Sequence, residues 1–187
     1  MIKKCKWCNL KNPRYIEYHD NEWCVPNFKD EYLYEMLILE SFQAGLSWEC
    51  VLNKRDSFRE AYDNFDIYKV CEYDDAKITE LLDNKDIIRN KLKIRASINN
   101  SRIFRDMVKE YGSFYNYLKE YAGETTIYET GVTTNAISDA ISADLQKRGM
   151  KFVGSTIIYS YLQAVGIIYS HDEECEMYIK SENAQLT

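Results

Sequence analysis

Proline and glycine are scarce in this chain, whose 187 residues include only two prolines and seven glycines. This scarcity excludes collagen-like and proline-rich linker architectures. It also leaves few turn residues for a many-stranded sandwich or barrel, and it therefore favours helices. With 45% hydrophobic and 29% charged residues, the composition is that of one ordinary globular domain.

An excess of basic charge is missing as well. The 24 Lys and Arg residues face 30 Asp and Glu residues, and the net charge of −6 argues against a nucleic-acid partner unless basic residues gather locally. The charged start, Met1–Lys6, is not followed by an apolar segment, so no secretory signal is expected. The six cysteines are scattered, and we expect reduced thiols and a cytoplasmic location rather than a disulfide framework.

One stretch, residues 152–170, contains no charged residue and approaches the length of a membrane-spanning helix. Gly, Ser, Thr and Gln residues interrupt it, and it stands alone in the chain. We therefore interpret it as a strand-free core segment of a soluble protein and not as a membrane span.

Apolar spacing and cap residues predict an all-α fold over residues 1–187 as a single domain. Asp30, Ser47, Asp66 and Asp74 are the expected N-caps of four helices. The predicted helices cover about residues 30–44, 47–58, 66–70, 74–82, 92–111, 113–121, 135–147 and 155–166.

Three segments fall outside this helical pattern. A loop is expected over residues 122–134, which contain two Gly and five Thr. The tail after about residue 179 is expected to be disordered. The first 25 residues show no clean helical period, so we expect them to be irregular, or held by something other than packing.

Histidine is rare, and its two copies lie near cysteines. His171 and Cys175 are four residues apart and would share one face of a helical turn, while His19 lies near Cys5 in the sequence. Together these residues would make a Cys₂His₂ tetrahedral metal site of the structural kind, closed to water. Two alternatives stay open: Cys5 and Cys8 have the spacing of a zinc knuckle, and the His171/Cys175 pair arises readily by chance.

Glu40 shares a predicted helix face with Leu33 and Leu37, so we expect its carboxylate to be at least partly desolvated and to need a partner. That partner is either a structural Arg or a cationic ligand. Aromatic residues flank Glu40 in the sequence and would hold the ring of a flat cation by stacking and cation–π attraction. They are Tyr15, Tyr18, Trp23, Phe42 and Trp48.

Residues 147–156 (KRGMKFVGST) place two glycines and three cations between two predicted helices. A glycine turn that opens a helix presents free backbone N–H groups to an anion, as sequence-independent binding of a phosphate backbone requires. The candidate residues are Gly149, Lys151, Gly154, Ser155 and Thr156. A plain Schellman-capped turn explains Gly149 equally well.

Three blocks together resemble the bacterial 3-methyladenine DNA glycosylase I family, whose members belong to the helix-hairpin-helix DNA glycosylases. The blocks are residues 15–26 (YIxYHDNEWxVP), 33–48 (LxEMxxLExxQAGLSW) and 147–166 (KRGxKFVGxTIxYSYxQAxG). With weaker matches such as residues 87–90 (IIRN), the resemblance covers nearly the whole chain.

The resemblance implies a helix-hairpin-helix glycosylase fold whose termini are joined at one structural Zn²⁺ site. By this resemblance the ligands would be Cys5, His19, His171 and Cys175, whereas Cys8 matches no ligand position.

For the pocket, the resemblance implies that Glu40 contacts a flipped base and that Tyr18 and Trp48 are pocket aromatics, with Tyr15 and Trp23 at neighbouring positions. The turn at residues 149–156 would grip DNA.

The chain departs from the family pattern at two positions. Cys24 and Asp86 stand where the family usually has Gly, so the backbone geometry there is open to question.

The implied function is DNA repair. A monomeric enzyme would flip 3-methyladenine out of double-stranded alkylated DNA and hydrolyse its N-glycosidic bond. Because no motif Lys lies among the candidate pocket residues, we expect no strand cleavage. Two alternatives are a glycosylase of the same superfamily for another damaged base, and a zinc-stabilised binding module without catalysis.

Overall fold

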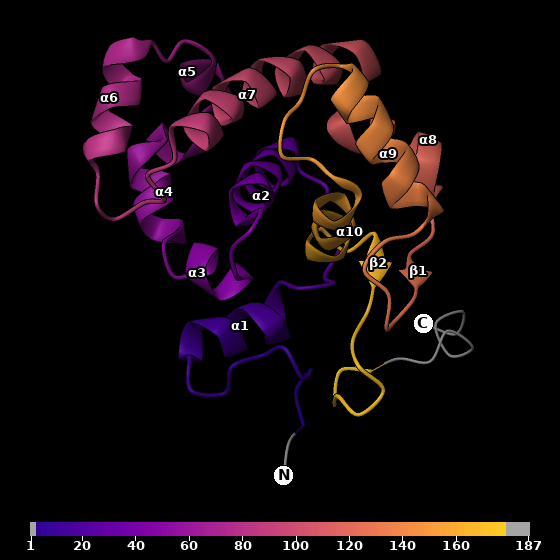
Figure 1. Cartoon of the computed structure of the whole chain (residues 1–187). Helices are drawn as coiled ribbons and strands as arrows, with labels where there is room; N and C mark the ends of the chain where they lie inside the picture. Colours follow the sequence, from indigo (N-terminus) through magenta and orange to yellow (C-terminus); the bar gives the residue numbers. More distant parts are fainter. Residues whose placement is uncertain (1–2, 179–187) are drawn as a thin grey trace.

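The computed structural model describes residues 3–178, and the predicted disorder after residue 179 lies outside the described residues. The fold is mostly helical, as predicted (Figure 1). The helices are α1 (Pro13–Asn21), α2 (Asp30–Gln43), α3 (Trp48–Leu52), α4 (Arg55–Ala61), α5 (Ile67–Cys71), α6 (Asp75–Asp83), α7 (Lys91–Tyr111), α8 (Phe114–Ala122), α9 (Ala136–Lys147) and α10 (Ser155–Ala164). A 3₁₀ turn, η1, covers Asp63–Phe65, and two short strands are β1 (Ile127–Tyr128) and β2 (Ile168–Tyr169).

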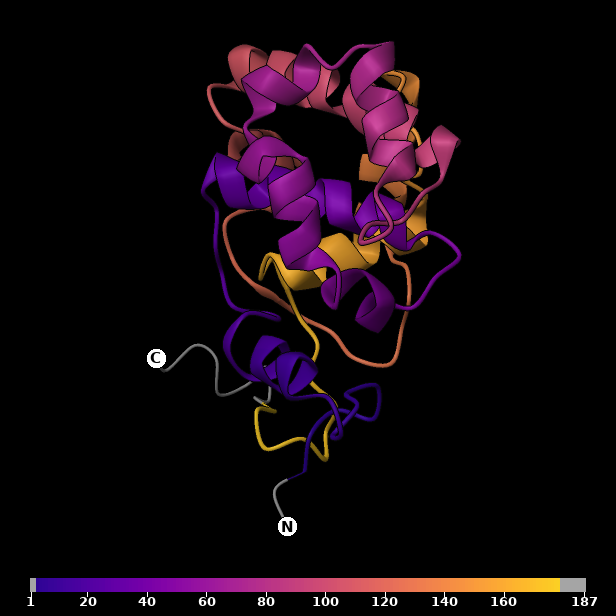
Figure 2. The same ribbon diagram turned by 90° about the vertical axis from the view of Figure 1, so that its left-hand side faces the viewer.

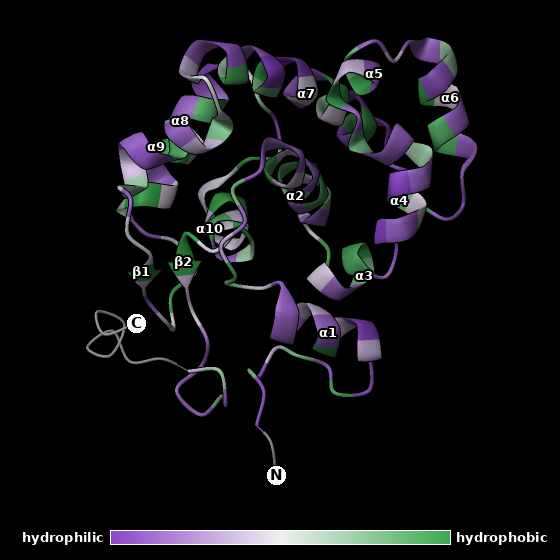
Figure 3. Cartoon of the chain, turned by 180° about the vertical axis from the view of Figure 1, so that it is seen from behind, coloured by the Kyte–Doolittle hydropathy of each residue, from purple (hydrophilic) through white to green (hydrophobic). Residues whose placement is uncertain are grey.

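Helix α2 forms the centre of the core and packs against α7 and α10 (Figure 1). The sequence predicted one apolar stripe on this helix, but it is buried on nearly every side, as expected for a helix enclosed by others. The outer helices α7, α8 and α9 carry hydrophobic and hydrophilic residues along their length, as amphipathic helices do (Figure 3). No helix of the described chain is long and apolar enough to span a membrane.

Most predicted helix boundaries are confirmed because local capping determines them. The side chains of Ser47, Asp66 and Asp74 accept hydrogen bonds from the first turns of α3, α5 and α6. Gly112 ends α7 in the left-handed conformation, as its sequence position predicted.

The prediction that Asp30 caps α2 is wrong, because Lys29 occupies the cap position and Asp30 lies inside the helix. The Asp30 carboxylate instead accepts the backbone N–H of Phe114, 2.8 Å away, at the start of α8. The single helix predicted from Ser47 to Phe58 is divided into α3 and α4 by a break at residues 53–54.

Two further predictions need correction. The first 25 residues are not irregular throughout, since α1 begins where the Asn12 side chain accepts the N–H of Arg14 and Pro13 supplies a preset φ. The segment 152–170 is not strand-free, because β2 pairs in parallel with β1 in the predicted loop.

Helix α1 and the two ends of the described chain lie together at one end of the molecule, below the remaining helices (Figure 2). Cys24, where the family usually has Gly, has φ +64, a left-handed conformation that normally favours glycine. Asp86 has no such conformation.

Candidate active site

A cavity of about 480 Å³ opens between α1, α2, α3 and α10, large enough to enclose a single flat ring system. Glu40 and four of the aromatic residues singled out from the sequence line it, and they come from α1, α2, α3 and the segment after α1. The fifth aromatic residue, Phe42, is buried in the core and does not line the cavity. The lining residues are Trp7, Tyr15, Tyr18, Trp23, Glu40, Gln43, Trp48, Gly131, Val132, Thr133, Ser160, Gln163, Ser170 and Asp172.

Glu40 is the only acid of α2 that reaches this cavity, and its side chain is 2% exposed. Among the described residues, its Oε2 atom has no hydrogen-bond partner and its carboxyl makes no ion pair. Burial therefore raises the pKa of the Glu40 carboxyl well above its usual range. The sequence left a structural Arg open as the partner of Glu40, but no Arg of the described residues pairs with it. The buried Arg55 pairs with Glu22 and Glu35.

Two more polar groups at the cavity wall lack partners in the described chain. They are the Oε1 atom of Gln43, one helical turn after Glu40, and the indole Nε1 of Trp48 at the start of α3. Buried polar groups are normally paired, because an unsatisfied one costs about 1–3 kcal/mol. A carboxyl, an amide oxygen and an indole N–H thus line one cavity, where a ligand with a polar edge would satisfy them.

Aromatic rings form the walls of the cavity. The ring of Tyr18 lies 5.4 Å from that of Trp48, and the ring of Trp7 lies 5.1 Å from that of Tyr15 and 4.6 Å from that of Trp23. Helix α1 supplies both tyrosines, so the position of this helix determines the shape of the pocket. Such walls accept a planar ring, and a cationic one gains cation–π attraction in addition.

Several lining residues were missed from the sequence. Trp7 lies in a segment without periodicity, so nothing in the sequence connects it to the pocket. Gln43 was part of the QAGLSW block and one turn from Glu40, which is a usable signal. The loop 131–133 and the α10 residues Ser160 and Gln163 become neighbours only through the fold.

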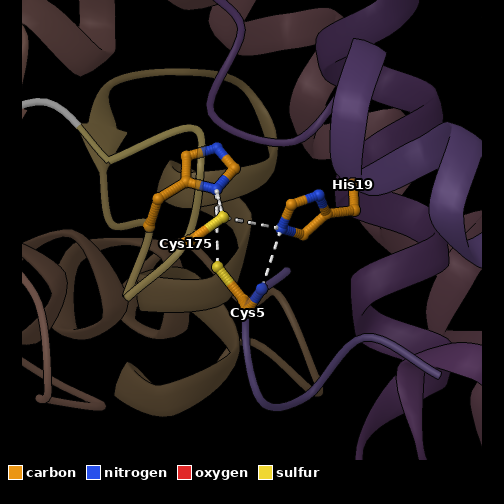
Figure 4. A group of neighbouring side chains, drawn as sticks. Cys5, His19 and Cys175 are labelled. Carbon is orange, nitrogen blue, oxygen red and sulfur yellow. Dashed lines mark hydrogen bonds between the residues drawn. The ribbon is translucent and has the colours of Figure 1, made fainter. Parts of the chain in front are cut away.

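Next to the pocket, four buried side chains from the two ends of the chain converge (Figure 4). The Sγ atom of Cys5 lies 3.4 Å from Nδ1 of His171, and the Sγ atom of Cys175 lies 3.5 Å from Nε2 of His19 and 3.6 Å from Nδ1 of His171. All four donor atoms lie within 4.8 Å of one another. These four residues are the ones predicted from the sequence as metal ligands. The cluster could hold a metal ion.

The geometry of this cluster fits a tetrahedral site. With Zn–S near 2.3 Å and Zn–N near 2.0 Å, the sulfur-to-nitrogen edge of a regular tetrahedron is about 3.5 Å. The three sulfur-to-nitrogen distances given above match this value. Cys8 is not a member, because its Sγ atom faces the carbonyl oxygen of Tyr15 at 3.8 Å.

Neighbouring groups prepare the ligands for metal binding. The Nδ1 atom of His19 donates to the Asp20 carboxylate at 2.7 Å, which leaves Nε2 as an acceptor on the side of Cys5 and Cys175. This Nε2 accepts the backbone N–H of Cys5 at 3.2 Å. Burial lowers the pKa of His171 to about 4, so its imidazole is neutral. Burial also raises the pKa of the Cys5 thiol, and a dication would offset the cost of the thiolate.

The cluster and the pocket share structural parts. The ring of Trp23 lies 4.7 Å from that of His171, and the ring of Trp7 lies 5.3 Å from that of His19. His19 belongs to α1, the helix that carries Tyr15 and Tyr18. Joining the ends of the chain at the cluster therefore fixes one wall of the pocket.

The predicted DNA-gripping residues lie on the turn between α9 and α10. Lys151, Gly154 and Thr156 are exposed, and the N-cap of α10 is Gly154, which offers no side-chain cap, so the first N–H groups of the helix lack a capping side chain. Gly149, with φ +100, also makes the Schellman motif that the sequence left open, because Met150 N–H donates to the carbonyl of Leu145.

This turn and the pocket belong to one helix. Ser155 begins α10 and donates a hydrogen bond to the Asp139 carboxylate at 2.5 Å, whereas Ser160 and Gln163 line the cavity further along. At 1.5 Å per residue, the cavity lies about 8–12 Å along the helix from the turn.

Comparison with known proteins agrees with this geometry. The chain matches the methyladenine glycosylase family model over residues 7–178. It is 41% identical over 184 residues to DNA-3-methyladenine glycosylase 1 of Escherichia coli (strain K12), covering 95% of this chain and 97% of that protein.

Solved structures agree as well. A crystal structure of 3-methyladenine DNA glycosylase I matches with a TM-score of 0.90 and 37% sequence identity. The match covers 95% of this chain and 100% of that chain. The structure of Staphylococcus aureus 3-methyladenine DNA glycosylase I, described for its recognition of 3-methyladenine, matches with a TM-score of 0.89 and 28% sequence identity. The match covers 95% of this chain and 99% of that chain. By the extent of these matches, the chain belongs to the methyladenine glycosylase family.

Proposed function

We propose that this protein is a DNA repair glycosylase that excises 3-methyladenine from alkylated DNA. The named activities of its relatives and their coverage of nearly the whole chain support this function. The observation that carries it is the buried carboxyl of Glu40 in an aromatic cavity, where its Oε2 atom has no hydrogen-bond partner within residues 3–178. A cavity of this kind suits a flat, cationic ring with hydrogen-bond donors at its edge.

The chemistry follows from the charge of the damaged base. A base inside a duplex is out of reach, so the enzyme must flip the nucleotide into the cavity. 3-Methyladenine in DNA is already cationic and leaves as a neutral molecule, so little general-acid work is needed. Glu40 accepts hydrogen bonds from the amino edge of the base, while Tyr18 and Trp48 hold its ring.

Water completes the reaction. Its oxygen forms a bond to C1′ of the sugar as the bond from C1′ to the base nitrogen breaks with both electrons going to the base, and the water proton passes to solvent. No lysine lines the cavity among the described residues, so no covalent enzyme–DNA intermediate forms and the strand stays intact.

A structural zinc ion and a duplex grip complete the proposal. Cys5, His19, His171 and Cys175 would hold one Zn²⁺, whose four protein ligands leave no open position for catalysis. The turn with Gly149, Lys151, Gly154, Ser155 and Thr156 would bind the phosphate backbone of double-stranded DNA. The enzyme is proposed to act as a monomer, as expected from the sequence.

Incubation with methylated duplex DNA and chromatography of the released bases tests this function. We expect release of 3-methyladenine, retention of 7-methylguanine, and no adduct trapped by borohydride. Glu40→Gln should lower excision by roughly 10–100-fold, the cost of losing a charged hydrogen bond. Glu31→Gln, at an exposed position of the same helix, is the matched control and should excise normally.

Other outcomes identify the alternatives. Release of a different base assigns the pocket to another lesion. Duplex binding without any released base indicates a binding module. Full excision by folded Glu40→Gln protein would show that Glu40 does not take part in recognising the base.

A further inference from the structure

Helix α7 contributes nothing to the lining of the cavity, yet its polar side chains hold the two segments that flank it. Lys93 and Asn100 are buried, with exposed fractions of 8% and 0%. They are seven residues apart and so lie on one face of the helix, about 10 Å apart along its axis.

Asn100 holds the turn between α9 and α10. Its Nδ2 donates to the carbonyl of Lys151 at 2.8 Å, and its Oδ1 accepts the N–H of the same residue at 2.9 Å. The next residue, Phe152, has φ +57, an unfavourable conformation that needs support from its surroundings. Asn99 adds one bond from its Nδ2 to the carbonyl of Gly149 at 2.9 Å.

Lys93 holds the other segment, the end of α2. Its Nζ donates to the carbonyls of Phe42 at 2.8 Å and Ala44 at 2.5 Å, on either side of the pocket residue Gln43. An ammonium there also complements the negative end of the helix dipole. The same Nζ lies 5.8 Å from the ring centre of Phe152, so Lys93 touches both segments.

We propose that Lys93 and Asn100 are positioning residues, through which α7 holds the α9–α10 turn and the end of α2 in one fixed arrangement. Under the proposed function, on which this inference rests, the phosphate backbone bound at the turn is then held at a fixed distance from the base that enters the cavity. Errors of about 1 Å in such placement cost large factors in rate, so a preformed arrangement is an advantage.

The first test separates duplex binding from base binding. We expect Asn100→Ala to raise the Kd for a duplex with an abasic-site analogue about tenfold, and the KM for methylated duplex similarly, because Lys151 loses both partners. The Kd for free 3-methyladenine should change less than about twofold, since Asn100 is remote from the lining residues.

Ser101→Ala is the matched control for a merely structural role. Ser101 is the next residue of α7, fully buried, and bonds the Tyr34 hydroxyl at 2.6 Å without touching the turn. The Ser101→Ala variant should have a lower melting temperature than wild type, as Asn100→Ala should, but an unchanged affinity for duplex DNA. Equal losses of duplex affinity in the two variants would refute the proposal, as would equal weakening of free-base and duplex binding by Asn100→Ala.

Two further variants keep the proposal testable if Asn100→Ala does not fold. Asn99→Ala removes one bond to the turn from an exposed side chain and should raise the duplex Kd about threefold. Lys93→Met keeps the packing volume but releases both carbonyls, so it should weaken free-base binding as well as duplex binding. Unchanged affinities in both variants would overturn the inference, and wild-type protein that binds duplex but releases no base would refute only the proposed function.

Discussion

Glu40 is costly for the free protein because a carboxyl without a partner has been removed from water. Burial raises the pKa of this carboxyl, because the charged form is disfavoured away from water. A cationic base in the cavity would favour the charged form and so oppose this effect of burial. The cost in the free state is thus recovered when the ligand binds, as in other functional sites that are destabilised in isolation.

This residue gives a pH-dependent prediction for stability. Because the folded-state pKa of Glu40 lies above the ordinary 4.5, the folded protein binds more protons than the unfolded chain, and the free energy of unfolding falls as pH rises above that value. Glu40→Gln has no such titration, so its stability relative to wild type should grow as the pH rises above about 4.5, until the Glu40 carboxyl of the folded wild type has ionised. Urea unfolding of both proteins at a series of pH values measures the difference between their free energies of unfolding. The contributions of all other titrating groups cancel in this difference.

Glu31→Gln is the control, because this carboxylate is exposed and its replacement should leave the pH dependence of the wild type intact. Parallel stability curves for wild type and Glu40→Gln would show that burial does not raise the pKa of Glu40, and would weaken its assignment to the pocket.

At the scale of elements, helix boundaries were predictable where one side chain satisfies its own first turn. Ser47, Asp66 and Asp74 do this within three residues, so the information is local. Asp30 shows the limit: its carboxylate bonds to the start of α8, 84 residues away, and nothing near it in the sequence indicates that choice.

Short elements were the hardest to predict. Strands β1 and β2 are two residues each, too short for any period, and their pairing depends on the fold that brings residue 127 to residue 168. Helix α1 had a usable signal in Asn12 and Pro13, an N-cap residue followed by proline. Apolar periodicity alone does not indicate this helix.

The turn after α10 gives a prediction about backbone packing. A Cβ on Gly166 would lie 2.4 Å from the backbone N of Pro26 and 2.5 Å from the carbonyl carbon of Val25, and φ is +79. Gly166→Ala should therefore cost more than about 3 kcal/mol in the free energy of unfolding, since rigid backbone must move and the left-handed conformation alone costs about 1–2 kcal/mol.

Gly112→Ala separates the two contributions. Gly112 has φ +82 and ψ −25, in the left-handed conformation, and a Cβ there would make only an ordinary contact with Nδ2 of Asn116 at 3.6 Å. Only the conformational cost of about 1–2 kcal/mol should therefore appear in denaturant unfolding. Equal losses in the two variants would mean that the contact between Gly166 and the Val25–Pro26 segment contributes nothing.

At the scale of the whole molecule, the site was more predictable than the fold around it. Cys5, His19, His171 and Cys175 could be grouped from the sequence because histidine is so rare, and the structure brings all four together. The pocket residues near Glu40 also lie in the compact blocks 15–26 and 33–48. Trp7 and the loop 131–133 were not predictable, because only the closure of the chain ends and the packing of α10 bring them to the cavity.

The joined ends of the chain give the last prediction. Cys175→Ser should reduce the metal content from one zinc per chain, and lower the melting temperature by about 4–8 °C, equivalent to a loss of at least about 2 kcal/mol. It should also weaken binding of free 3-methyladenine, because α1 carries both a ligand, His19, and the pocket residues Tyr15 and Tyr18. Elemental analysis, thermal unfolding and base titration of one preparation measure all three.

Cys8→Ser is the matched control for this experiment. Cys8 is buried in the N-terminal segment that carries Cys5 but lies outside the cluster, so its replacement should leave the zinc content and the affinity for the base unchanged. A wild-type protein purified without chelator that contains no metal would refute the zinc site. Zinc loss in Cys175→Ser with undiminished base binding would mean that packing of Trp7 and Trp23 against the two histidines is sufficient to hold α1 in place.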